Sequence, residues 1–285
     1  MKSNAAIVPA GSNGAISVFA TDTTDVVLDI NGYFVDPGNS AALAFYPLTP
    51  CRIADTRNTN GPLGGPALAA QSTRAFPILA SSCGLPANAQ AYSLNFAAVP
   101  KGSLGFLTAW PAGQPQPLAA SLNDPTGTIA ANAVVVPGGV NGAVSVFASD
   151  AADLVIDIGG YFAPPGPGGL SLYTVTPCRV LDTRLPQGAP PFTTAWDVNV
   201  LAAPCGVPAA ARAFLFNATA IPSEPLGYLT MWPQGQPRPL AATLNAYDGA
   251  ITNNMAIVPT TNGSVSIFPT DPTHLVLDAF GFFAQ

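Results

Sequence analysis

Asn132-Ala133-Val134-Val135-Val136-Pro137, followed by the pair Asn141-Gly142, is the stretch that decides the fold of this chain. The Asn-Gly pair stands between two strand-like apolar runs. Such a pair is the strongest local signal for a tight hairpin, because both residues tolerate positive φ. The same pattern returns at residues 4–9 with Asn13-Gly14 and at residues 254–259 with Asn262-Gly263. The chain therefore carries one β-hairpin motif three times.

A longer repeat surrounds two of these motifs. The sequence Cys-Arg-Ile-Ala-Asp-Thr-Arg at 51–57 returns as Cys-Arg-Val-Leu-Asp-Thr-Arg at 178–184. Leu-Thr-Ala-Trp-Pro at 107–111 likewise returns as Leu-Thr-Met-Trp-Pro at 229–233. The first copy closes on Asp-Ile-Gly-Gly-Tyr-Phe and the second on Asp-Ala-Phe-Gly-Phe-Phe. Each complete copy has the size of a domain.

Each repeat divides into a front part, which begins with the Cys-Arg motif, and a closing part, which holds the hairpin motif and ends on the aromatic motif. We predict complete repeats at residues 46–162 and 173–285, with Pro/Gly-rich linkers at 35–45 and 163–172. Residues 1–34 match a closing part alone. This partial repeat is a candidate donor of strands to another molecule.

The composition favours strands over helices. The 285 residues include 27 Gly, 31 Pro and a single Glu, so the residues that cover helix surfaces are scarce. Apolar residues alternate with small or polar ones at Tyr92, Leu94 and Phe96, which is the period of a half-buried strand. We predict an all-β chain of tandem antiparallel β-sandwich or barrel-like domains, joined by the Pro/Gly linkers.

The charge pattern argues against several partners. Nine Lys and Arg stand against 15 Asp and Glu, and no basic cluster is present to neutralise a phosphate backbone, so we expect no nucleic-acid partner. We also expect no membrane insertion, because no apolar run approaches the roughly 20 residues of a membrane span. Met1-Lys2-Ser3-Asn4 leads directly into strand-like sequence. Either a signal peptide has been removed or the chain is a fragment.

The four cysteines fall in pairs inside the repeats: Cys51 with Cys83, and Cys178 with Cys205. Four cysteines allow three pairings, and the repeat favours the disulfides Cys51–Cys83 and Cys178–Cys205. Disulfides indicate an oxidising compartment, so we predict an extracellular or cell-surface protein. A metal site is the competing interpretation, but neither His nor Cys-x-x-Cys accompanies any cysteine. We expect no metal and no cofactor.

The order of the motifs resembles a known module. Pro-Cys-Arg-x-x-Asp-Thr-Arg, Leu-Thr-x-Trp-Pro, Asn-x-x-x-Val-Pro and Asp-x-x-Gly-Tyr-Phe follow one another in this chain. This order is similar to that of a tandem β-rich repeat module of secreted and cell-surface bacterial proteins. The resemblance covers nearly the whole chain and implies secretion and tandem β modules, without a defined activity. The chain departs from the pattern in its incomplete first copy, and where Phe280 and Phe282 replace Gly159 and Tyr161.

The densest charges lie in the two Cys-Arg motifs: Arg52, Asp55, Arg57, Arg179, Asp182 and Arg184. One hypothesis is an anion- or sugar-binding cluster, since the Arg guanidinium binds carboxylates bidentately. We favour structural ion pairs, because a buried charge is costly unless it is paired.

Two tryptophans, Trp110 and Trp232, stand directly before Pro-x-Gly-Gln-Pro turns. An exposed indole can stack on a sugar ring, which makes both candidate sugar-binding residues and makes polysaccharide a candidate partner. The alternative is that both indoles lie in the core.

Catalysis has little support in the sequence. A nucleophilic triad needs a base such as His, and the only histidine, His274, has no counterpart in the other copies. Asp25 and Asp29 return as Asp153 and Asp157, but the last copy has His274 at the position of Asp25, which argues against a calcium site. We expect that the protein is not an enzyme.

We expect instead an extracellular structural protein, the subunit of a self-assembling surface filament or tube. If a sandwich needs strands from both parts of a repeat, residues 1–34 expose strand edges that another copy of the chain can satisfy by β-augmentation. Repetition of this head-to-tail contact gives an open homopolymer. The alternative function is a tandem carbohydrate-binding, lectin-like adhesion module. In a third interpretation, residues 1–34 are the cut edge of a longer repeat protein.

Overall fold

The computed structural model describes residues 2–285 and is all-β, as predicted. The first repeat supplies β1 (Ala44–Asp55), β2 (Ser72–Phe76), β3 (Ala91–Pro100), β4 (Leu104–Pro111), β5 (Leu122–Asp124), β6 (Ala130–Pro137), β7 (Val144–Ala148) and β8 (Ala152–Ala163). The second supplies β9 (Ser171–Asp182), β10 (Trp196–Asn199), β11 (Ala213–Pro222), β12 (Leu226–Pro233), β13 (Leu244–Ala246), β14 (Thr252–Pro259), β15 (Ser264–Pro269) and β16 (Thr273–Ala284). Short 3₁₀ turns are η1 (Ser12–Gly14), η2 (Ile78–Ala80), η3 (Val140–Gly142) and η4 (Val200–Ala202).

Each repeat is a sandwich of two four-stranded antiparallel layers. In the first repeat, the order β1-β8-β3-β6 faces β2-β7-β4-β5; in the second, β9-β16-β11-β14 faces β10-β15-β12-β13. A core of alternating side chains fills each sandwich, and in the first repeat Tyr92, Leu94 and Phe96 all point into it. The alternation seen in the sequence therefore marks the buried faces of the strands.

The last two strands of the closing part, β7 and β8 in the first repeat and β15 and β16 in the second, lie inside the layers rather than at their edges. Strand β8 pairs with β1 on one side and β3 on the other, while β7 lies between β2 and β4. A front part without its closing part would lack a central strand in both layers. Each sandwich therefore closes only when both parts are present.

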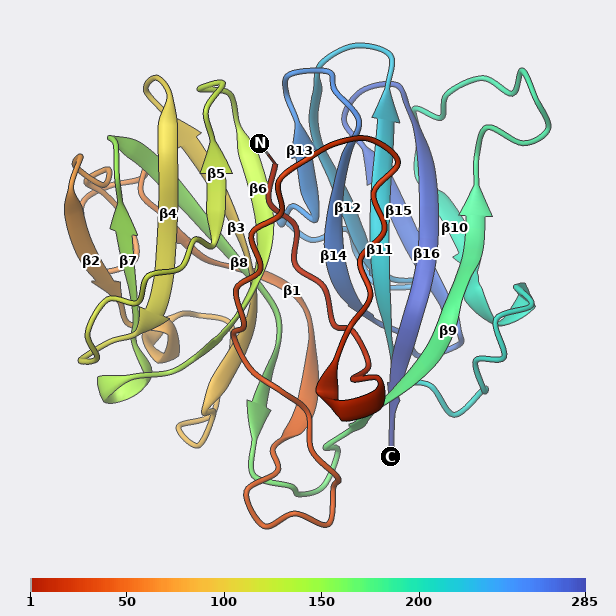
Figure 1. Cartoon of the computed structure of the whole chain (residues 1–285), viewed down its shortest axis with the longest axis horizontal. Coiled ribbons are helices and arrows are strands. Elements are labelled where there is room, and N and C mark those ends of the chain that lie inside the picture. Colours follow the sequence, from red (N-terminus) through yellow and green to blue (C-terminus); the bar gives the residue numbers. More distant parts are fainter. Residues whose placement is uncertain (1) are drawn as a thin grey trace.

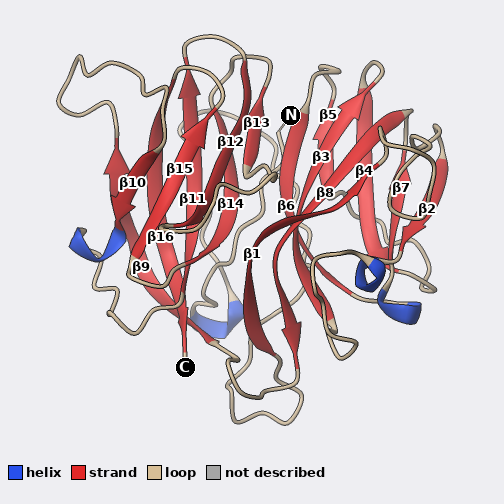
Figure 2. Cartoon of the chain, turned by 180° about the vertical axis from the view of Figure 1, so that it is seen from behind, coloured by secondary structure: helices blue, strands red, loops and turns tan. Residues whose placement is uncertain are grey.

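The two sandwiches lie side by side and share a core (Figures 1 and 2). A pair between Ala246 of β13 and Ala130 of β6 joins one layer of each into an eight-stranded sheet. Behind it, Phe45 and Phe162 of the first repeat pack with Leu215 and Phe283 of the second. This contact between repeats was not predicted from the sequence. The expectation was of two domains joined only by linkers.

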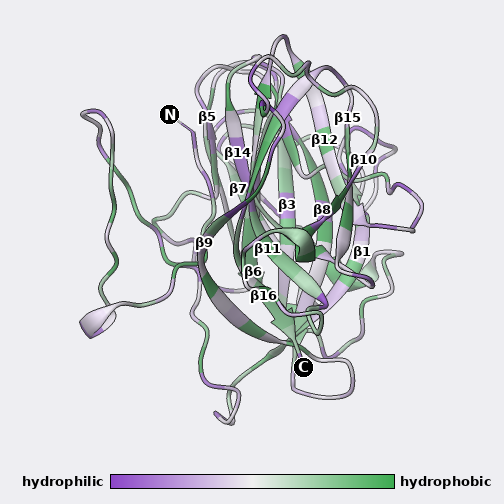
Figure 3. Cartoon of the chain, turned by 90° about the vertical axis from the view of Figure 1, so that its right-hand side faces the viewer, coloured by the Kyte–Doolittle hydropathy of each residue, from purple (hydrophilic) through white to green (hydrophobic). Residues whose placement is uncertain are grey.

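The N-terminal segment crosses one face of the molecule between the sandwiches (Figure 1, red). Of its described residues, 2–43, none belongs to a strand, and η1 is their only regular element. Figure 3 shows part of this segment standing away from the body. Met1, which the predicted partial repeat includes, lies outside the described residues.

Candidate assembly site

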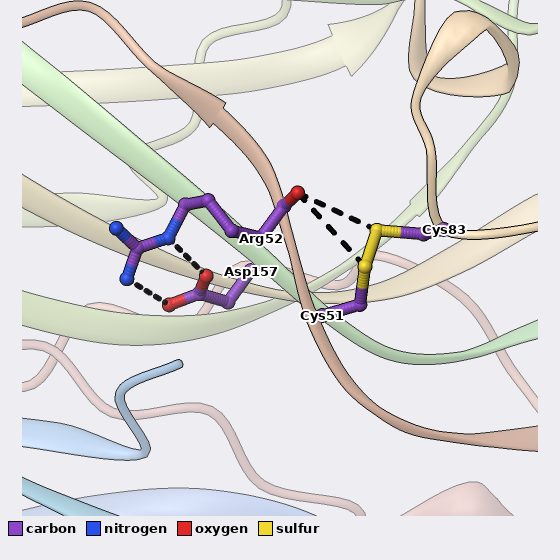
Figure 4. Close-up of a disulfide and its surroundings, with 4 residues drawn as sticks. All are labelled: Cys51, Arg52, Cys83 and Asp157. Carbon is purple, nitrogen blue, oxygen red and sulfur yellow. Dashed lines mark hydrogen bonds and ion pairs between the residues drawn. A yellow bond between two sulfur atoms is a disulfide. The ribbon is translucent and has the colours of Figure 1, made fainter. Parts of the chain in front are cut away.

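Both predicted disulfides are formed. Cys51 is bonded to Cys83, and Cys178 to Cys205. Each ties the first strand of a repeat to the loop that follows its first 3₁₀ turn, and Figure 4 shows the disulfide of the first repeat. They enclose 32 and 27 residues of sequence, and loop entropy predicts that each stabilises its sandwich by about 3.5 kcal/mol. The two disulfides indicate an oxidising, extracellular environment.

The charges of the first Cys-Arg motif form structural ion pairs, as predicted. Arg52 of β1 binds the carboxylate of Asp157 on β8, which joins the front part to the closing part (Figure 4). Arg57 donates to Asp55 over 2.6 Å and lowers the pKa of that carboxyl. Burial raises the pKa of Asp157, and Arg52 offsets only part of that effect. These groups are engaged with one another and offer no free cluster to an anion.

The second repeat has the same pairs in a more open setting. Arg179 binds Asp278, and Arg184 donates to Asp182 over 2.6 Å. The hydrogen bond from Arg184 lowers the pKa of Asp182 to about 2. The side chain of Arg179 is 50% exposed, whereas that of Arg52 is 23% exposed. In the first repeat the ion pairs are therefore covered by neighbouring parts of the chain, and in the second repeat they are not.

The proposed sugar-binding role of the tryptophans is wrong. Trp110 and Trp232 are only 6% and 5% exposed. Each indole nitrogen donates to a backbone carbonyl four residues later, Trp110 to Gln114 over 2.8 Å and Trp232 to Gln236 over 2.9 Å. Neither ring presents a face to a ligand: both indoles are buried, although neither belongs to the clusters that fill the sandwiches between their layers.

The remaining candidate residues are scattered. In residues 2–285, no three His, Cys, Asp or Glu side chains come together in a group that could hold a metal ion. His274 lies 3.3 Å from the hydroxyl of Thr183, within the second repeat. Over the same residues, no helix is long and apolar enough to cross a membrane.

The segment 2–34, here named the N-terminal closing segment, retains the hairpin turn of a complete repeat. Asn13 has φ 57° and ψ 28°, and the equivalent Asn141 has φ 56° and ψ 29°. In both turns a glycine N–H donates over 2.9 Å to the carbonyl four residues ahead, Gly11 to Ala15 and Gly139 to Ala143. The local sequence thus sets the turn even where the flanking strands have not formed.

The apolar residues of this segment are exposed where their equivalents form the sandwich core. Val18 is 59% exposed and Val146 0%; Leu28 is 66% exposed and Ile156 0%; Ile30 is 84% exposed and Ile158 1%. Further exposed apolar side chains of the segment are Val8, Ile16, Phe19, Val26, Val27 and Tyr33. So many exposed core positions make this segment a candidate interaction surface.

The start of the segment docks as a third copy of the contact between the repeats. Asn254 of β14 donates to the side chain of Asn95 and accepts from the N–H of Ala133, both over 2.8 Å. Asn4, the equivalent of Asn254, makes the same two bonds to the next repeat, donating to Asn217 and accepting from Met255, both over 3.1 Å. The segment therefore lies on the second repeat as the second repeat lies on the first.

A second equivalent contact links the first repeat to the N-terminal closing segment. The N–H of Ala242 in the second repeat donates to Asp157 of the first over 2.9 Å. The N–H of Ala120, the counterpart of Ala242 in the first repeat, donates to Asp29 of the N-terminal closing segment over 3.1 Å. The same contact thus runs from the second repeat to the first, and from the first to the segment.

Three equivalent phenylalanines meet at the centre of this arrangement. The ring of Phe34 lies 6.0 Å from that of Phe162 and 6.4 Å from that of Phe283. Ala5 and Ile7 pack against the same core. The three closing parts are therefore arranged cyclically, with pseudo-threefold symmetry. We call this arrangement the ring; its third position holds a closing part without a front part.

The incomplete copy could be recognised from the sequence, but the ring could not. One signal was present: Asn4, Asn132 and Asn254 recur at one position of all three copies, next to residues that vary. A polar residue retained at one position of each copy indicates a contact between copies, but the partners Asn95 and Asn217 stand far away in the sequence.

A scan against protein-family models finds no family that matches this chain, and a search of curated proteins finds no match either. Its function is therefore inferred from its own geometry.

Proposed function

We propose that this chain is a structural module of an extracellular assembly, built from repeat units that pack in a ring of three. The observation that carries the proposal is the N-terminal closing segment, which exposes Val18, Leu28 and Ile30 at positions that are core in a complete repeat. Burying such side chains yields about 1.5–3 kcal/mol each. The segment therefore favours assembly with a partner that covers them.

The use of the charged and aromatic residues supports a structural role. Arg52 and Arg179 hold front parts to closing parts, and Trp110 and Trp232 are buried, each bonded to the turn that follows its strand. The disulfides add stability that suits a protein outside the cell. The motifs that recur in both repeats are thus engaged in holding the sandwiches together.

The contacts favour a closed ring over the open filament expected from the sequence. The contact between repeats is head-to-tail, and such contacts form rings when the rotation between units closes. Here the N-terminal closing segment touches the second repeat through Asn4 and the first through Asp29. Units stacked through this contact return to the start after three. A filament stays a prediction that would need a different surface.

Native protein tests the proposal. The protein purified from its source is examined by native mass spectrometry and electron microscopy, and its limited proteolysis is compared with that of the recombinant chain. We expect particles larger than one chain, in which residues 16–34 resist a protease that cuts them in the recombinant chain. A native monomer of 28.9 kDa whose segment is cleaved as fast as the recombinant one would contradict assembly through this segment.

A further inference from the structure

We propose that the third position of the ring binds a front part of the same repeat type, supplied by a repeat unit outside residues 1–285 and not by a second copy of this chain. The occupant is a five-stranded half sandwich with the Cys-Arg and Trp-Pro motifs. This inference rests on the proposed function and names its partner.

Counting parts argues against a second copy. Residues 35–285 contain two front parts and two closing parts, and both front parts already hold their own central strands, β7 and β8 or β15 and β16. The N-terminal closing segment adds a third closing part. Any number of copies, whether or not they exchange strands, leaves one closing part per chain without a front part. A partner that satisfies the segment must bring a front part whose centre is empty.

The second repeat has an uncovered face where this partner would dock. In the first repeat, β1 lies under β12 and β14 of the second repeat. Its equivalent, β9, has no buried residue, and five of its 12 residues are exposed. Asp278 illustrates the difference: its side chain is 22% exposed, while that of the equivalent Asp157 is 4% exposed. Moving one step around the ring places a third front part over β9, as the second repeat covers β1.

Polar groups mark the same position. Asp157 accepts the N–H of Ala242, whereas Asp278, its equivalent, accepts within residues 2–285 no bond from another repeat. Asn132, the equivalent of Asn254, is buried, and within the described residues its Oδ1 atom has no hydrogen-bond partner. A buried polar atom without a partner costs about 1–3 kcal/mol. When the third sandwich closes, we expect Asn132 to bond to it as Asn254 bonds to the first repeat.

The connection that such a front part needs is short. In the complete repeats, five residues join its last strand to the closing part: 125–129 between β5 and β6, and 247–251 between β13 and β14. Lys2 corresponds to the first residue of β6. A front part in the third position therefore ends within a five-residue loop of Lys2.

A completed chain tests this assignment. Residues 44–129 are fused directly before Lys2, which reproduces the order and loop length of a complete repeat. Hydrogen exchange is then followed at the amides of residues 16–34. We expect exchange at least about a hundredfold slower than in the unmodified chain, because these residues become central strands. The matched control is the same fusion carrying Leu28→Asp and Ile30→Asp, which should exchange as fast as the unmodified chain.

A second fusion guards against misfolding of the first. It carries residues 171–251, the front part of the second repeat, before Lys2. If neither fusion slows exchange at residues 16–34, the assignment is overturned. Dimers of the unmodified chain with slow exchange at these residues would also overturn it, in favour of a second copy. The two proposals can fail separately. If the native protein assembles but neither fusion slows exchange, the proposed partner is refuted and the proposed function is not.

Discussion

Arg52 and Arg179 occupy the same place in the same motif, yet their surroundings differ. Arg52 pairs with Asp157, which is nearly buried, while Arg179 pairs with Asp278 in a half-open site. Removing one partner of a buried pair costs about 3–5 kcal/mol because the other charge stays buried. An exposed pair contributes about 0–1 kcal/mol. The position of each repeat in the ring therefore decides what its motif contributes.

The first prediction follows from this contrast. Arg52→Ala should lower the free energy of unfolding by about 3–5 kcal/mol, and Arg179→Ala, its matched control, by less than about 1 kcal/mol. Urea denaturation followed by tryptophan fluorescence measures both. Equal losses in the two variants would show that the burial of Asp157 has no energetic effect.

Asp182 gives a pH prediction. The hydrogen bond from Arg184 lowers its pKa from 3.8 to about 2, so the folded chain holds the charged carboxylate more strongly than the unfolded chain does. The stability it contributes is fully present above about pH 4, the usual pKa range of Asp in an unfolded chain, and is lost as the pH falls through about 2. Asp182→Asn should flatten the fall in the urea midpoint between pH 4 and pH 2. An unchanged slope in that variant would rule out this contribution.

The partners of the charged residues could be predicted only where they are near in sequence. The pairing of Asp55 with Arg57, two residues apart, follows from the motif itself. The partner of Arg52 is Asp157, 105 residues away, and only the pairing of β1 with β8 brings them together. The sequence likewise could not decide whether Trp110 is buried, because alternation defines two faces of a strand without showing which face is exposed to solvent.

At the scale of elements, the hairpin turns were predictable and the strands of the N-terminal closing segment were not. Asn13-Gly14 forms its turn alone, since the turn needs only φ and ψ values that these residues tolerate. A strand also needs a neighbour to bond its backbone. Residues 24–34 are similar in sequence to β8, but the two strands that flank β8 in its own sheet, β1 and β3, have no counterpart for them. Similar sequences are therefore a central strand in one copy and without strand structure in the other.

The next prediction uses this duplication. Ile158→Ala should destabilise the first repeat by about 2–5 kcal/mol, the usual loss for a buried isoleucine. Ile30→Ala, at the equivalent position of the N-terminal closing segment, should change stability by less than about 0.5 kcal/mol, because the side chain is already exposed. Thermal unfolding of both variants measures these two losses. A large loss from Ile30→Ala would mean that residues 24–34 are paired in solution.

At the scale of the whole molecule, the repeat predicted the number of sandwiches but not how they meet. The ring depends on side chains such as Asn254, which reaches Asn95 across 159 residues of sequence. Neither the hydrophobic periodicity nor the turn signals predict a contact between residues so far apart in the sequence. What the sequence does hold is the identity of the three equivalent positions, and the ring gives them different environments: Asn254 has all its partners, and Asn132 lacks one.

The last prediction concerns this difference between Asn254 and Asn132. Asn254→Ala leaves the buried N–H of Ala133 unpaired and removes a link between the repeats, so we expect a loss of about 3 kcal/mol. Asn132→Ala removes only the bond to Ser121 and relieves an oxygen that is already unsatisfied, so its loss should be about 1 kcal/mol or less. In the fusion that completes the third repeat, Asn132 gains the missing partners, and the loss from Asn132→Ala should rise to that of Asn254→Ala. Urea denaturation of the unmodified chain, the fusion and these three variants measures the losses. A loss from Asn132→Ala that is the same with and without the third front part would show that the ring does not close through this residue.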